Sequence, residues 1–146
     1  LAYARKKVDY YLSQIDNHNI SCQKGCAHCC HHLIHLSPAE TYSFGELSIE
    51  KESKRAPQVA HYRSGKEWSS LDKQTRRCIF LDDNDSCSKY EDRPLVCRIT
   101  QVTSPAEHCD LEKNLEIKPF FEDKANIIVL AYYTVEESFP LPISFS

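Results

Sequence analysis

Apolar residues recur at helical spacing near both ends of the chain. The stripe near the start predicts a helix over residues 3–17, and the stripe near the end predicts one over residues 119–137. The β-branched and aromatic content of the second stripe also fits a strand. The two stripes consist of Val8, Tyr11, Leu12 and Ile15, and of Phe121, Ala125, Ile128, Tyr132 and Val135.

A helix-start signal occurs twice between these stripes. Residues 37–40 (SPAE) combine an N-cap serine, a proline at the first helical position and a glutamate that completes a capping box. They predict a helix over residues 38–55, which Gly45 weakens and Pro57 follows. Residues 104–107 (SPAE) repeat the signal and predict a second capped start.

The segment around Cys78 and Cys87 predicts a small hairpin. An apolar strand-like piece follows Cys78, a polar turn rich in aspartate comes next, and Cys87 lies on the second arm. A short helix is expected to start at Pro94, and the proline-rich residues 138–146 are expected to be extended.

The expected fold is a single domain over residues 1–146, mainly α-helical with a small cysteine-rich loop and hairpin region. Its 41% hydrophobic and 27% charged residues fit such a domain. The longest apolar run, residues 127–133, is too short to span a membrane, and the N-terminus has no secretory signal. We therefore expect a cytoplasmic protein with no membrane partner. The chain contains no methionine, so we expect it to be a fragment or to omit residues.

Charge is unevenly distributed along the chain. The net charge of −3 argues against a general nucleic-acid binder. Residues 51–77 carry eight basic and three acidic side chains, whereas residues 107–137 carry eight acidic and three basic ones. We interpret this as two solvated helix faces of opposite sign, with a partner surface as the alternative.

Eight cysteines are the main chemical signal. In a reducing compartment such cysteines are typical of metal sites or catalytic thiols, and the short spacings around the adjacent Cys29 and Cys30 fit a disulfide framework badly. The spacing Cys22-x3-Cys26-x2-Cys29 lets a chain wrap one ion without strain. Neighbouring side chains diverge, so Cys30 is expected to serve a second metal or to be a buried apolar thiol.

Thiolates are ligands of zinc ions and of iron–sulfur clusters alike, so the sequence leaves open which metal is bound. Two four-thiolate sites, or a cluster plus a zinc ion, would use all eight cysteines. The nearby cations Lys24, Arg93 and Arg98 would offset the negative charge of the thiolates.

The two cysteine stretches together resemble the YkgJ-type cysteine-cluster family. The first stretch is Cys22-x3-Cys26-x2-Cys29-Cys30, and the second follows the pattern Cys-x-Phe-Leu, a turn, then Cys-x-x-Tyr-x-x-Arg-Pro-x-x-Cys-Arg. That second pattern comprises Cys78, Phe80, Leu81, Cys87, Tyr90, Arg93, Pro94, Cys97 and Arg98.

The resemblance covers roughly residues 22–109 and implies a domain that chelates zinc or iron, either as zinc ions or as a 4Fe-4S cluster. The same pattern is similar to part of the flagellin lysine N-methylases, which implies iron–sulfur-dependent methyl transfer as one outcome. The candidate metal ligands are Cys22, Cys26, Cys29, Cys30, Cys78, Cys87, Cys97 and Cys109.

Other chemistry-bearing residues carry weaker signals. His28 with His32, and His31 with His35, form i, i+4 pairs that would share a face if this stretch were helical. We expect polar residues on a turn instead, because zinc surrounded by cysteines rarely needs histidines. The aspartates of residues 82–85 lack the loop length of a calcium site. The spacing of the first cysteines also occurs in radical S-adenosylmethionine enzymes, but the chain lacks their alternating strand–helix pattern.

Three functions fit these observations. The first is a small metal-binding protein whose site is mainly structural. The second is an iron–sulfur-dependent enzyme or enzyme component, and the third is a metal carrier or thiol redox relay. The sequence identifies a metal ion as partner, but no catalytic residue, substrate or protein partner, so enzymatic activity stays an open question.

Overall fold

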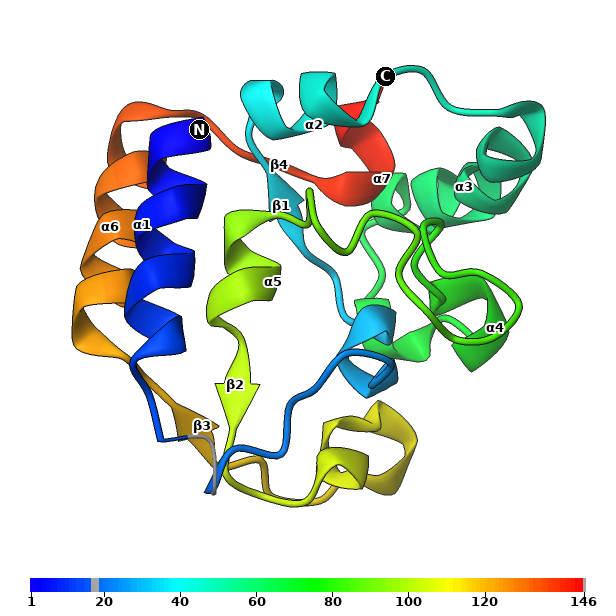
Figure 1. Ribbon diagram of the computed structural model, residues 1–146. Coiled ribbons are helices and arrows are strands. Elements are labelled where there is room, and N and C mark those ends of the chain that lie inside the picture. The colour runs from blue at the N-terminus through cyan, green and yellow to red at the C-terminus, as the bar shows by residue number, and fades with distance from the viewer. Residues whose placement is uncertain (17–18, 146) are drawn as a thin grey trace.

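The computed structural model describes residues 1–16 and 19–145, and it confirms a mainly α-helical fold with small β parts (Figure 1). The α-helices are α1 (Ala2–Ser13), α2 (Pro38–Phe44), α3 (Ile49–Arg63), α4 (Lys73–Arg76), α5 (Leu95–Ile99), α6 (Asp123–Val135) and α7 (Leu141–Ser144). The 3-10 helices are η2 (His28–His31), η3 (Trp68–Ser70), η4 (Ala106–Cys109) and η5 (Leu111–Lys113).

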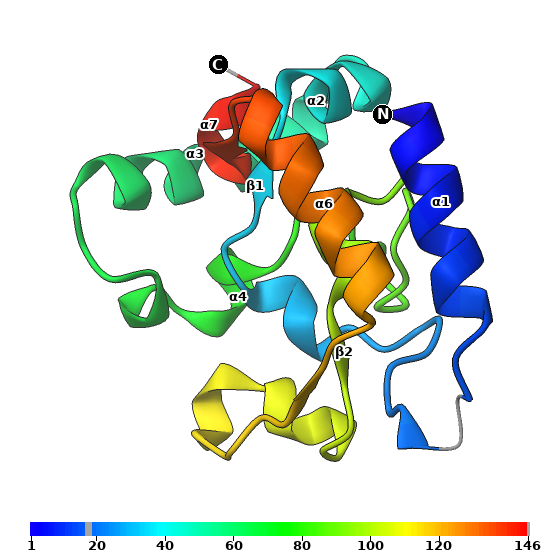
Figure 2. The same ribbon diagram turned by 90° about the vertical axis from the view of Figure 1, so that its left-hand side faces the viewer.

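Two short antiparallel strand pairs tie distant parts of the chain together. β1 (His35–Leu36) pairs with β4 (Phe139–Pro140), and β2 (Gln101–Val102) pairs with β3 (Pro119–Phe120). Figure 1 shows α1 and α6 together on one side of the molecule, α3 and α4 on the other, and α5, β2 and β1 between them. Figure 2, turned by 90°, shows α6 lying beside α1 along much of its length.

The buried apolar side chains form two separate clusters. The helix cluster joins α1, α5 and α6, and the loop cluster joins β1, α2, α7 and the segment before the aspartate turn. The helix cluster comprises Ala4, Val8, Leu95, Ala125 and Val129. The loop cluster comprises Leu36, Phe44, Ile79, Phe80 and Leu141.

The accessible surface of the protein is larger than its mass requires. The accessible surface is 8953 Å², whereas a compact monomer of 16.9 kDa exposes about 7,700 Å². Because the fold exposes more surface than its mass requires, hydrophobic burial alone supplies less stabilisation than in a typical domain of this size.

The carboxylate of Glu40 links three helices in the interior. The expected capping box forms at α2, since Ser37 Oγ accepts the Glu40 amide N–H and Glu40 accepts the Ser37 amide N–H. The same carboxylate accepts the Leu95 N–H at 2.8 Å, at the start of α5, and the Tyr133 hydroxyl at 2.8 Å, from α6. The glutamate that caps α2 therefore also holds α5 and α6 in place, and its side chain is fully buried.

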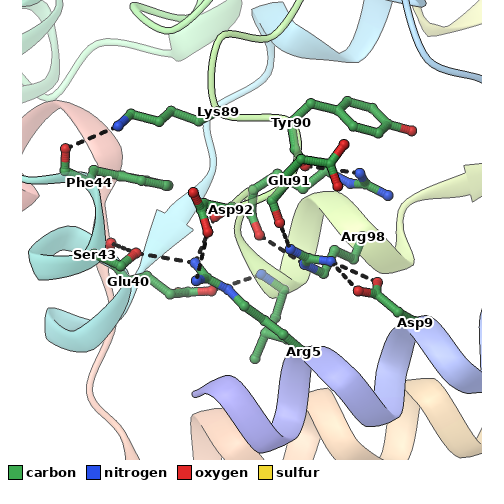
Figure 3. Close-up of polar contacts among 12 residues, drawn as sticks. Arg5, Asp9, Glu40, Ser43, Phe44, Lys89, Tyr90, Glu91, Asp92 and Arg98 are labelled. Atoms are coloured by element: carbon green, nitrogen blue, oxygen red, sulfur yellow. Dashed lines mark hydrogen bonds and ion pairs between the residues drawn. The ribbon is translucent and has the colours of Figure 1, made fainter.

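Two arginines join α1 to the segment before α5 (Figure 3). Arg98 is buried and donates to both carboxylate oxygens of Asp9 at 2.7 and 2.5 Å, and to the Arg93 and Glu91 carbonyls. Arg5 donates to the Asp92 carbonyl oxygen at 2.6 Å. Helix α1 is thus held by guanidinium groups as well as by apolar contacts.

The structure corrects the expected helix over residues 38–55. The chain ends α2 before Gly45, whose φ of 71° suits glycine, and starts α3 where Ser48 accepts the Lys51 amide N–H. Pro57 does not follow the helix but lies inside α3. The proline removes one backbone hydrogen bond there, and the helix continues through it.

The structure also corrects three smaller expectations. The second SPAE segment forms the 3-10 helix η4 without a side-chain cap, because Ser104 Oγ instead accepts the Lys118 N–H at 3.1 Å. The hairpin expected after Cys78 is reduced to one antiparallel bridge between Leu81 and Cys87. The tail expected to be extended forms β4 and then the short helix α7.

The basic and acidic segments partly pair with each other. Lys73 Nζ lies 2.7 Å from Asp110 Oδ2, and Arg76 forms an ion pair with Glu112. These contacts join α4 to η4 and η5, so the uneven charge distribution serves tertiary packing in this region.

We predict that Glu40→Gln destabilises the protein by about 1–3 kcal/mol, because an amide NH2 would replace an oxygen that accepts a buried N–H. The change is measured as the free energy of unfolding in urea. Glu46→Gln, at an exposed position of the same segment, is the control. Equal stability of the two variants would contradict the central role of Glu40.

Candidate metal centre

Seven of the eight cysteines border one cavity in the middle of the molecule, with a volume of about 320 Å³. Val96 and Cys97 of α5 border it next to the helix cluster, and Phe44, Phe80 and Leu141 border it from the loop cluster. The cavity therefore lies between the two apolar clusters. The bordering cysteines are Cys22, Cys26, Cys29, Cys30, Cys78, Cys87 and Cys97.

The 3-10 helix η2 holds the surrounding segments together through its backbone. The Cys30 carbonyl accepts the Cys78 N–H at 2.8 Å, which joins the first cysteine stretch to the second. The His31 carbonyl accepts the Trp68 indole N–H at 2.9 Å. The His32 ring Nε2 lies 2.9 Å from the Cys109 carbonyl oxygen, so the eighth cysteine is held beside the same helix.

Cys29 and Cys30 face the same cavity, although neighbouring side chains were expected to diverge. In a 3-10 helix with three residues per turn, successive side chains are about 120° apart rather than on opposite faces. Both thiols can therefore border one space. Cys30 is half-buried at the cavity and is not enclosed in an apolar environment elsewhere.

Crowding and burial raise the thiol pKa values. Burial raises the pKa of Cys78 to about 11, with smaller contributions from Cys87 and Cys29. Burial likewise raises the pKa of Cys109 to about 11, and that of Cys97 well above its ordinary value. The pKa of Cys29 is raised chiefly by its hydrogen bond with Cys30 and then by burial. A bound cation would stabilise the negatively charged thiolate forms, which burial and crowding disfavour.

Of the three expected cations, Arg93 has the clearest effect on the thiols. Its guanidinium lies 4.0 Å from the Tyr90 ring centre and lowers the pKa of Cys87, against the larger effect of burial that raises it. Arg98 borders the cavity, but its donors are directed to Asp9 and to backbone carbonyls. The Lys24 ammonium lies over the Tyr90 ring at 5.1 Å and is mostly exposed.

The histidine pairs do not share a helical face. The 3-10 helix covers His28–His31 and the chain is extended at His32, while His35 is exposed in β1. His32 borders the cavity, but its ring nitrogen is engaged by the Cys109 carbonyl. Burial lowers the pKa of His31, which disfavours its charged form.

The donor set fits a soft metal, but the thiols do not converge on one point. Within residues 1–16 and 19–145, no group of three or more His, Cys, Asp or Glu side chains is arranged to hold a metal ion. Zinc holds each thiolate at about 2.3 Å. Metal binding would therefore draw the cysteines inward, and most of them lie on loops or on a short 3-10 helix.

Several cavity residues were not expected from the sequence. Gln58 of α3 is 2% exposed and donates to the Thr75 and Arg77 carbonyls, which positions the chain just before Cys78. Trp68 borders the cavity and fixes η2 through its indole N–H. No local pattern marks these residues, because their partners are distant in the sequence.

The described part of the chain contains no helix with the length and apolar content needed to cross a bilayer. Comparisons with curated proteins and with solved structures gave no significant match. A model of the CxxCxxCC family, described as a candidate zinc- or iron-chelating domain, matches residues 21–124. The match spans more than two thirds of the chain and includes all eight cysteines. The chain therefore belongs to the CxxCxxCC family of candidate zinc- or iron-chelating domains.

Proposed function

We propose that this chain is a metal-binding domain whose clustered cysteines coordinate zinc or an iron–sulfur cluster, and that the metal has a mainly structural role. The observation that carries the proposal is the place of the thiols. They border the space between two apolar clusters that do not join into one core. A metal bound there would cross-link segments that hydrophobic contacts leave separate.

Folding and metal binding are expected to be coupled for this reason. The first cysteine stretch, residues 22–30, contains no buried side chain, so we expect its order to depend on what the thiols bind. A metal that binds only the folded state adds about 4 kcal/mol of stability when its free concentration is a thousand times Kd. Free thiols of this kind persist in a reducing compartment, which supports a cytoplasmic location.

A second candidate function is an iron–sulfur enzyme or enzyme component. It is favoured by the mixed lining of the cavity, which Phe44, Phe80 and Leu141 border together with the thiols. A small molecule bound in this cavity would contact the metal. The resemblance to part of the flagellin lysine N-methylases supports group transfer, with methyl transfer as the class of reaction.

Metal analysis of protein purified without oxygen separates the two candidates. Colourless protein with about two zinc ions per chain would support the structural centre, because zinc takes four thiolates. Brown protein that contains iron and inorganic sulfide would support the iron–sulfur alternative. Protein with neither metal, and no gain of stability when zinc or iron is supplied, would contradict both.

We predict that metal removal by a chelator under reducing conditions lowers the melting temperature and exposes the cysteine loops to protease. Cys97→Ser is expected to reduce metal content and stability together, because Cys97 borders the cavity from α5. Circular dichroism and metal analysis of the same samples provide the two readings. Metal loss without loss of fold would support a carrier or redox relay and contradict the structural role.

We predict that His32→Ala lowers metal affinity by about 10- to 100-fold, as is typical when a side chain that orients a ligand is removed. The physical reason is the contact between the His32 ring and the Cys109 carbonyl. His35→Ala, in the exposed strand nearby, is the matched control and should bind metal normally. Similar affinities for both variants would show that the His32 contact does not position Cys109.

A further inference from the structure

Helix α6 has an apolar face on the side away from the core. Ala125 and Val129 belong to the helix cluster, whereas Ile127 and Leu130, on the opposite side of the helix, are 65% and 70% exposed. Figure 2 shows α6 lying across the side of the molecule that faces the viewer. The outer face of α6 comprises Ile127, Leu130, Ala131, Thr134 and Val135, with Asp123 and Lys124 at its start.

This face carries no charge over most of its length. Residues 125–135 contain no charged side chain, and the charges of Asp123 and Lys124 sum to zero. The other two long helices expose charged residues, such as Lys6 on α1 and Lys54 on α3. A helix that is apolar on all sides is normally buried. The composition of α6 therefore indicates that another surface covers its outer face.

A groove lies beside the outer face of α6. It has a volume of about 570 Å³, and the residues that border it include Ile99 of α5 and Asn126, Ile127, Leu130 and Tyr133 of α6. Ile127 and Leu130 thus belong both to the exposed apolar face and to the wall of the groove. A surface that combines exposed apolar side chains with a groove that can receive them is able to pair with a copy of itself, as a two-fold symmetric interface requires.

We propose that the outer face of α6 and the adjoining groove form a dimer interface, and that the partner is a second copy of this chain. Each copy of a two-fold dimer offers the same surface, so Leu130 of one copy would lie against the face and groove of the other. None of the described residues that line the thiol cavity belongs to α6. The inference therefore goes beyond the proposed metal-binding function and does not depend on it.

The distribution of charge favours a second copy as the occupant. The chain has a net charge of −3, so two copies repel each other over much of their surface. The outer face of α6 is uncharged along its middle, and two copies can meet there without placing like charges opposite each other. An anionic membrane or a nucleic acid would require several cations, whereas Lys124 is the only basic residue between positions 119 and 146.

The exposed area of the protein is compatible with such an interface. The protein exposes 8953 Å², whereas a compact monomer of 16.9 kDa exposes about 7,700 Å². This excess is larger than the roughly 800 Å² that each partner buries in a standard interface. Covering the outer face of α6 with a second copy would therefore bring the exposed area closer to that of a compact protein.

The test is sedimentation velocity of the full chain, purified without oxygen and kept reduced, from micromolar to millimolar concentration. The reductant prevents the free cysteines from cross-linking two copies. The wild type is expected to shift from monomer to dimer as its concentration rises. Ile127→Glu should raise the dissociation constant about tenfold or more, because the interface would bury an unpaired carboxylate. Ile49→Glu, at a 91% exposed position of α3, is the matched control and should dimerise like the wild type.

A pair of variants with opposite charges identifies the partner as a second copy. Leu130 lies in the middle of the outer face, so the two Leu130 positions of a two-fold dimer are expected to lie near each other. Leu130→Glu and Leu130→Lys should each be monomeric alone, because like charges would meet. An equal mixture of the two should form a dimer, because opposite charges then meet across the interface. Recovery in the mixture also demonstrates that both variants are folded.

Three results would contradict the proposal. The first is a wild type that stays monomeric up to millimolar concentration. The second is dimerisation of Ile127→Glu with the dissociation constant of the wild type, which would assign the dimer to another surface. The third is a monomer that binds phosphatidylcholine vesicles and loses this binding in Ile127→Glu, since the occupant would then be a lipid surface. All three leave the metal-binding function standing, because metal content is measured separately.

Discussion

The structure depends on a space that apolar side chains do not fill. The helix cluster and the loop cluster each bury a few side chains, and the thiol-lined cavity lies between them. The buried Glu40 carboxylate joins the two sides, since it reaches from α2 to α5 and α6. Arg98 joins α5 to Asp9 on α1 within the helical side. A fold joined in this way keeps a central site open, at the cost of hydrophobic stabilisation.

The same arrangement explains why helices α1, α5 and α6 are held more firmly than the loops that carry most of the cysteines. Helices α1, α5 and α6 are held by burial and by buried hydrogen bonds, so Cys97 on α5 has a fixed base. Cys22, Cys26 and Cys87 lie on loops held mainly by backbone hydrogen bonds. A metal that bound them would therefore close the loops onto a preformed helical side, and the free energy of binding would become free energy of folding.

The sequence patterns predicted those structural features that depend only on residues close together in the chain. The helix of the second apolar stripe and the capping box of α2 are local features, and both formed, although α6 begins at Asp123 and leaves Phe121 outside it. The pairing of Arg98 with Asp9, and the second use of Glu40 as an acceptor for α5, join residues far apart in the chain. No local spacing encodes such contacts. Arg98 was therefore expected to offset the thiolate charge, whereas its guanidinium is directed to Asp9 on α1.

The doublet of cysteines shows how backbone conformation changes the meaning of a motif. In an extended chain Cys29 and Cys30 would point to opposite sides, and the natural conclusion would be two separate sites. The short 3-10 helix places them about 120° apart, and both thiols border one cavity. The local conformation of η2 therefore brings both cysteines of the doublet to the same space, which their adjacency in the sequence did not predict.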